Sequence, residues 1–150
     1  MTLEAPDPDF EARVRASFAR QAFMATIGAT MVSVRPGEVA LEVPHRVDLT
    51  QQHGFLHAGV LAALADSACG YAAFTLMPAD RAVLSVEFKT NLLAPAKGER
   101  FRATARVVRS GRTLTVCTAE VMAVEAGQET LVAVMQATMI GLENRPGRSS

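Results

Sequence analysis

The sequence predicts an α+β domain in which an antiparallel β-sheet wraps around one long central helix. The segment Ala58–Met77 is apolar on nearly every side of a helix, which is typical of a helix buried inside a domain. Apolar and polar residues alternate in the segments that follow, as in strands with one buried face. Short turns separate those segments and favour antiparallel neighbours. The chain of 150 residues suffices for one such domain, spanning residues 1–150, and contains no internal repeat.

The first elements precede the central helix. Apolar residues recur at helical spacing over about residues 10–24 and predict an N-terminal amphipathic helix. Two strands are expected next, at 29–34 and 39–43, with a turn at Pro36-Gly37 between them. A polar loop over residues 50–54 then precedes the central helix.

The remainder of the chain reads as β-structure followed by a tail. Pro95 and Gly98 interrupt the chain after the first strand of this group, and turns are expected at Ser110-Gly111 and at 126–128. The tail over about residues 143–150 is polar and is expected to be frayed. The predicted strands are 84–91, 101–107, 114–124 and 131–140.

Composition excludes several classes of protein. Fifteen basic and fifteen acidic residues give zero net charge, which argues against a nucleic-acid-binding surface. Cys69 and Cys117 lie far apart in apolar surroundings, so buried thiols are expected instead of a disulfide or a metal pair. The acidic, proline-containing start lacks the features of a signal peptide, and we expect a cytoplasmic protein.

Asp66 is the most informative residue. It is the only carboxylate between Ala58 and Met77, and its presence there also argues against a membrane span. A carboxylate in apolar surroundings is costly, so its position needs a reason. Two readings stay open at this point: Asp66 reaches solvent or a backbone amide, or it performs chemistry.

The residues just before the central helix favour the second reading. Gln51, His57, Ala58 and Gly59 gather polar groups and free N–H donors at the positive end of the helix dipole, a setting that suits a developing oxyanion. Asp66 lies nine residues after His57, roughly 13 Å along the helix. One chain therefore cannot easily bring both groups to one carbonyl. A two-fold dimer that joins one chain's helix N-terminus to the other chain's Asp66 would solve this.

The segment from Gln51 to Asp66 closely resembles the active-site segment of PaaI-like hotdog thioesterases, relatives of 4-hydroxybenzoyl-CoA thioesterase. The resemblance extends over about residues 31–140. It implies a hotdog fold and hydrolysis of an acyl-CoA to a free acid and CoA. It further implies that Asp66 acts as general base or nucleophile, that the Ala58 N–H polarises the carbonyl with help from Gln51, and that His57 orders the turn.

The same resemblance assigns further roles. Ser85 matches a hydroxyl that positions water in some members, Gly59 belongs to the turn at the substrate, and Arg112 lies in a turn near the nucleotide. Lys89 is a second candidate for the CoA phosphates, although solvated surface charge is the more ordinary explanation of either side chain. The family forms a homodimer or homotetramer with active sites at subunit interfaces and needs no cofactor.

The sequence departs from the family pattern at two positions. Ala58 stands where the pattern has its middle glycine, and Gly70 stands where some relatives carry Thr or Ser four residues after the acid. The Ala58 amide survives, but its methyl group can crowd the carbonyl. We expect these changes to affect rate and substrate choice more than reaction class.

Rival functions are weighed on particular residues. A hotdog hydratase or dehydratase uses a His five residues after the Asp, where this chain has Tyr71. A non-catalytic acyl-ligand binding protein would not need Gln51, His57 and Asp66 together. A metal site at His53 and His57 is not expected, because no Cys, Asp or Glu lies close by in a ligand pattern.

Overall fold

The computed structural model describes residues 2–144 and shows a curved antiparallel sheet around a central helix. The strand order within the described residues is β1-β2-β4-β5-β6-β3, and every neighbouring pair is antiparallel. This arrangement confirms the predicted α+β hotdog architecture. The elements are α1 (Phe10–Arg20), α2 (Ala22–Ile27), β1 (Thr30–Arg35), β2 (Glu38–Pro44), the 3-10 helix η1 (Val47–Leu49), α3 (Ala58–Phe74), β3 (Arg81–Leu92), β4 (Arg100–Ser110), β5 (Leu114–Glu125) and β6 (Gln128–Glu143).

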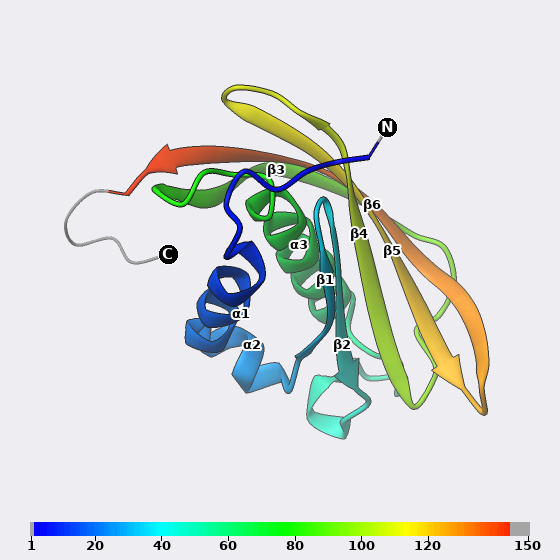
Figure 1. Cartoon of the computed structure of the whole chain (residues 1–150). Coiled ribbons are helices and arrows are strands. Elements are labelled where there is room, and N and C mark those ends of the chain that lie inside the picture. The colour runs from blue at the N-terminus through cyan, green and yellow to red at the C-terminus, as the bar shows by residue number, and fades with distance from the viewer. Residues whose placement is uncertain (1, 145–150) are drawn as a thin grey trace.

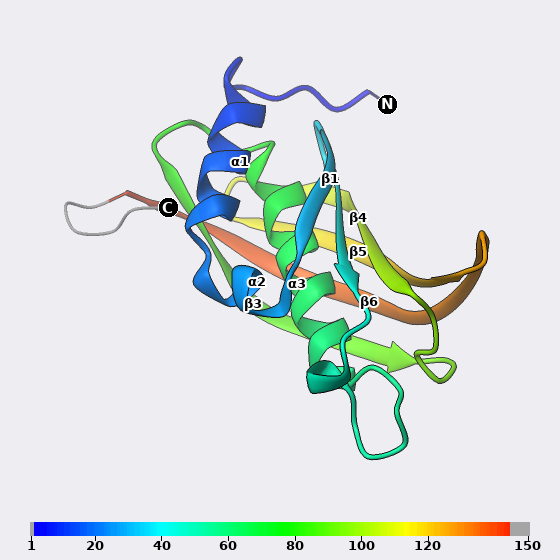
Figure 2. The ribbon, with the colours of Figure 1, turned by 90° about the horizontal axis from the view of Figure 1, so that it is seen from below.

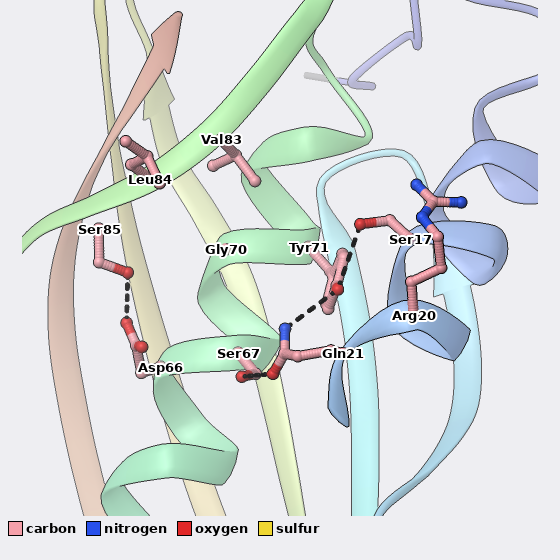
Figure 3. Close-up of a pocket in the computed structure, with 10 residues that line it drawn as sticks. All are labelled: Ser17, Arg20, Gln21, Asp66, Ser67, Gly70, Tyr71, Val83, Leu84 and Ser85. Carbon is pink, nitrogen blue, oxygen red and sulfur yellow. Dashed lines mark hydrogen bonds between the residues drawn. The ribbon is translucent and has the colours of Figure 1, made fainter. Parts of the chain in front are cut away.

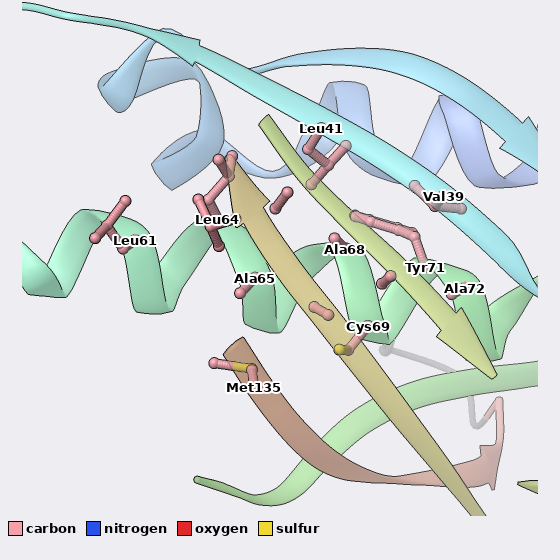
Figure 4. Close-up of a cluster of buried hydrophobic side chains, with 14 of the residues drawn as sticks. Val39, Leu41, Leu61, Leu64, Ala65, Ala68, Cys69, Tyr71, Ala72 and Met135 are labelled. Atoms are coloured by element: carbon pink, nitrogen blue, oxygen red, sulfur yellow. The ribbon is translucent and has the colours of Figure 1, made fainter. Parts of the chain in front are cut away.

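Helix α3 forms the centre of the core, as its uniform hydrophobicity predicts. Leu64, Ala68 and Cys69 are fully buried, and α3 contacts every strand from β2 to β6. Figure 4 shows these side chains packed against residues of the sheet. Alanine is the best helix former and has a short side chain, so an Ala-rich helix is stable and also lets the sheet approach it closely.

The sheet supplies the other half of the core through alternation. Phe101, Ala103 and Ala105 of β4 are fully buried, and the residues between them are more exposed. Small inward residues leave room for the helix, and the sheet curves around it in Figures 1 and 2. In both views α1 and α2 lie beside α3, on the side that the sheet leaves open.

The N-terminal helix predicted over residues 10–24 is instead two helices. The break is at Gln21, whose backbone is extended, with φ −79° and ψ 95°. The Gln21 side chain there exchanges hydrogen bonds with Ser67 and Tyr71 of α3, so tertiary contacts accompany the interruption. Arg13 of α1 also links α1 to this region: its guanidinium donates to the carbonyl oxygen of Phe74, the last residue of α3, and to those of Met77 and Pro78 just beyond it.

Strand β3 occupies one edge of the sheet and is mostly exposed. A β-bulge between Ser85 and Glu87 reverses which residues face the helix, so Ser85 and Phe88 pair with buried residues of β6. Leu84 and Phe88 are 53% and 45% exposed. A long apolar edge strand is unusual in a protein that works as a single chain.

The tail predicted from about residue 143 overlaps the end of β6 by one residue. Glu143 ends β6, where it pairs with Arg81, and the N–H of Asn144 donates to Asp80. Residues 145–150 of the predicted tail lie outside the described residues. None of the helices within residues 2–144 is long and apolar enough to cross a membrane.

Candidate active site

The N-terminus of α3 is organised by His57. His57 is the N-cap residue, and its Nδ1 accepts a hydrogen bond of 2.8 Å from the Gly59 N–H. A β-carbon at Gly59 would lie 2.9 Å from that Nδ1, so a side chain there would push the ring out of its place. His57 therefore caps the first turn of α3. The Gly59 N–H donates to His57 and is therefore not available to a substrate.

Two other donors remain free near this turn. The Gln51 side-chain oxygen accepts from the His53 N–H, which leaves the Gln51 NH₂ group able to donate elsewhere. The Ala58 N–H has no hydrogen-bond partner within residues 2–144. An unpaired N–H at a helix N-terminus, together with the helix dipole, attracts negative charge.

Asp66 lies on a stripe of α3 that its own chain leaves partly open. Asp66 is half-buried. The Ser85 hydroxyl donates a hydrogen bond of 2.6 Å to Asp66 Oδ1. The structure thus brings together two predicted site residues, one from α3 and one from β3, as Figure 3 shows.

A cavity of about 340 Å³ opens beside this pair. Among residues 2–144, Asp66 is the only carboxylate that lines it. The contribution of α1 and Gln21 could not be predicted from the sequence, because nothing in the periodicity of α1 indicates which face meets α3. The lining residues are Ser17, Arg20, Gln21, Asp66, Ser67, Gly70, Tyr71, Val83, Leu84 and Ser85.

Other predicted residues lie apart from this cavity. Ala58 and Asp66 are eight residues apart on the regular helix α3, a rise of about 12 Å. Lys89 lines a separate hollow on the outer face of the sheet, with Arg106 and Gln136. Arg112 lies near the turn between β4 and β5, in a hollow that Met77 also lines. One chain therefore does not gather all the predicted site residues.

The cysteines take no part in this site. Both are buried and free, and the Cys117 thiol contacts the Cys69 carbonyl oxygen at 3.5 Å. The hydrogen bond with Cys117 and then burial raise the pKa of the Cys69 thiol far above its ordinary value. A thiol that stays protonated is a poor nucleophile. Within residues 2–144, no three His, Cys, Asp or Glu side chains gather as a potential metal site.

The fold and the site together define a hotdog protein with a carboxylate on the open side of its central helix. Residues 53–130 match the model of the Thioesterase superfamily, and the chain belongs to that family. Among curated relatives, a 1,4-dihydroxy-2-naphthoyl-CoA hydrolase from Listeria monocytogenes is 31% identical over 91 residues, covering 61% of this chain and 74% of the relative. The family to which this chain belongs includes hydrolases of acyl-CoA thioesters.

Solved structures agree with this assignment. A thioesterase family protein from Silicibacter pomeroyi is 54% identical, with a TM-score of 0.89 over 90% of this chain and 99% of the other. The PaaI protein of Escherichia coli, from the phenylacetic acid degradation operon, has a TM-score of 0.80 over 89% of this chain and 94% of its own. At 21% identity, the likeness to PaaI shows a shared fold.

Two glycines of α3 give opposite predictions when they are replaced by alanine. A β-carbon at Gly70 would meet nothing within 4 Å, so Gly70→Ala should raise the free energy of unfolding by about 0.5–1 kcal/mol, through helix propensity. Gly59→Ala should lower it by about 0.5–2 kcal/mol, because the methyl group displaces the His57 cap. Urea denaturation measures both changes. A stabilised Gly59→Ala variant would contradict the proposed role of the cap.

Proposed function

We propose that this protein hydrolyses an acyl-CoA thioester to a free carboxylic acid and CoA, with Asp66 as general base or nucleophile. The observation that supports this most is the Asp66–Ser85 pair at the mouth of a cavity, in a chain of the Thioesterase superfamily. The Ser85 hydroxyl donates to one carboxylate oxygen and leaves the other free to attack the thioester or to deprotonate water. Ser85 therefore orients the acid.

The charge that develops on the thioester oxygen needs donors. The Ala58 N–H and the Gln51 NH₂ group are the free donors at the N-terminus of α3, where the helix dipole adds positive potential. Removing one such donor from an enzyme typically costs 10²–10³ in kcat. In our proposal these two groups bind the oxyanion, and His57 holds the turn that carries them.

The reacting groups come from two chains in this proposal. β3 is a sheet edge with unpaired backbone groups and exposed apolar side chains, so a second copy can pair with it across a two-fold axis. Such an axis runs the partner's α3 antiparallel to this one. If the axis is level with the midpoint of the Ala58–Asp66 span, the N-terminus of the partner helix faces Asp66 on the open stripe of this helix. Each dimer holds two equivalent sites, and a tetramer preserves them.

Recognition of the CoA nucleotide is the remaining part of the proposal. Lys89 and Arg112 lie in hollows away from Asp66, and neither forms an ion pair within residues 2–144. The long pantetheine arm separates the nucleotide from the thioester, so remote cations suit a role in binding. We assign both side chains to the CoA phosphates.

Asp66→Asn is expected to leave a folded protein and to lower kcat by at least about 100-fold, because the amide can neither attack nor accept a proton. Released thiol, measured over a panel of acyl-CoAs, follows turnover, and circular dichroism checks the fold. Ser85→Ala should lower kcat less, since the carboxylate remains. A well-folded Asp66→Asn variant with normal kinetics would reject the mechanism, and no thiol release by the wild type would favour a binding protein or a hydratase.

Mixing two inactive variants tests the sharing of sites between chains. Asp66→Ala and Gln51→Ala subunits should form hybrid dimers with one intact site. At equal amounts of the two variants, half of the dimers are hybrids. In each hybrid one of the two sites is intact and the other carries both substitutions, so about one quarter of wild-type activity should return. Subunit exchange is followed separately with differently tagged chains. Exchange without recovered activity would contradict shared sites.

Lys89→Ala and Arg112→Ala should raise KM for acyl-CoA and change kcat little, because the phosphate contacts exist equally in the ground and transition states. An acyl-pantetheine thioester lacks the nucleotide, so the same variants should treat it as the wild type does. Arg100→Ala, which removes a cation paired with Glu42, is the matched control. Equal losses of kcat on both substrates would place these residues at the reacting centre or in the fold.

A further inference from the structure

The wall of the Asp66 cavity that α1 and Gln21 supply is polar. Gln21 donates through Nε2 to the Tyr71 hydroxyl at 3.1 Å and accepts from the Ser67 hydroxyl at 3.0 Å. Ser17 Oγ lies 3.3 Å from the same Tyr71 hydroxyl. Figure 3 shows this chain of hydrogen bonds on the α1 side of the cavity, opposite Ser85. An apolar acyl chain would gain little from such a wall.

This network has more donor hydrogens than it uses. Ser17 and Tyr71 share one hydrogen bond between two hydroxyl groups, so one hydroxyl hydrogen has no acceptor in the network, whichever group donates. The Gln21 NH₂ group has a second N–H, and no acceptor for it is found within residues 2–144. A group that only accepts hydrogen bonds complements this surface best.

Arg20 adds positive charge to the same wall. It lines the cavity from the last turn of α1, and within residues 2–144 it forms neither an ion pair nor a side-chain hydrogen bond. By contrast, Arg15 on the same helix pairs with Glu11, and Arg13 is bound to carbonyl oxygens of the α3 end. Asp66, the only lining carboxylate, lies with Ser85 across the cavity from this wall. Arg20 is thus the cation that is free to meet a ligand here.

We infer that the cavity selects acyl groups that carry a carboxylate at the end remote from the thioester, so that the substrates are half-thioesters of dicarboxylic acids. This inference rests on the proposed function. The thioester lies at Asp66, the acyl chain crosses the cavity over Gly70, and the distal carboxylate accepts from Arg20 and the spare hydroxyl hydrogen. Gly70 keeps this route open, because it places no side chain above α3. Arg20 and Tyr71 act here as specificity-determining residues.

Matched substrates test the inference. Glutaryl-, adipoyl- and pimeloyl-CoA are compared with pentanoyl-, hexanoyl- and heptanoyl-CoA, pair by pair at equal carbon number. We expect kcat/KM to favour the carboxylate by roughly 10-fold at the best-fitting length, the lower range for a hydrogen bond to a charged group. Arg20→Gln should reduce that preference to near unity by lowering kcat/KM for the carboxylate-ended substrates. Tyr71→Phe should reduce it by a smaller factor.

Arg15→Gln is the matched control, because it removes a cation from the same helix outside the cavity, and it should keep the full preference. The 6-hydroxyhexanoyl thioester separates charge from simple hydrogen bonding: if it is hydrolysed as well as adipoyl-CoA, the inferred carboxylate is wrong. The inference is also wrong if every methyl-ended substrate is hydrolysed at least as well as its carboxylate-ended partner. It is equally wrong if the preference for the carboxylate persists in Arg20→Gln. Either result leaves the proposed function standing. If no acyl-CoA is hydrolysed, the proposed function itself fails.

Discussion

The length of one straight helix constrains the arrangement of this site. The free N–H of Ala58 and the carboxylate of Asp66 lie on the same helix, about 12 Å apart in rise. A thioester carbonyl is far shorter than this separation, so one chain cannot use both groups on one bond. The helix holds each group rigidly in place, and in our proposal a second chain supplies the missing half of the site. The exposed edge strand β3, next to Asp66, provides a surface where that chain can pair.

Helix α3 packs against the sheet on one side and leaves Asp66 accessible on the other. On the side that faces the sheet, small and medium apolar residues are buried and hold the core together. On the other side Asp66, Ser67 and Gly70 form a partly open stripe. Glycine inside a helix costs about 1 kcal/mol relative to alanine, and at Gly70 nothing nearby forbids a side chain. The position therefore loses stability without a packing reason, which fits a requirement for space above the helix.

Most of the fold could be predicted from local patterns. Apolar and polar residues alternate in β4 to β6, and α3 is uniformly hydrophobic. Both patterns reflect which side chains are buried, so they can be recognised in the sequence. The break at Gln21 could not be predicted, because it is accompanied by hydrogen bonds to Ser67 and Tyr71, some fifty residues away in the chain. The exposure of β3 was hidden for a related reason. Its apolar residues look the same in sequence whether a core or another chain covers them.

The candidate site was predicted in part. Asp66 stood out as a charge in an apolar segment, and the family resemblance indicated Ser85, which the structure places within hydrogen-bonding distance. Ser17 and Arg20 were missed, because polar residues on an amphipathic helix normally face solvent. Only the packing of α1 beside α3 reveals that they line the same cavity. Long-range packing, not residue type, decides which polar side chains meet.

In our proposal the site is complete only where two chains meet along β3. Activity per chain is measured against protein concentration, with sedimentation velocity under the same conditions, for the wild type and for Phe88→Lys. Phe88→Lys puts a charge on the exposed edge and leaves the Asp66–Ser85 pair intact within each chain. We predict that specific activity follows the fraction of associated chains in both proteins. A dissociated monomer with full activity per chain would contradict the account.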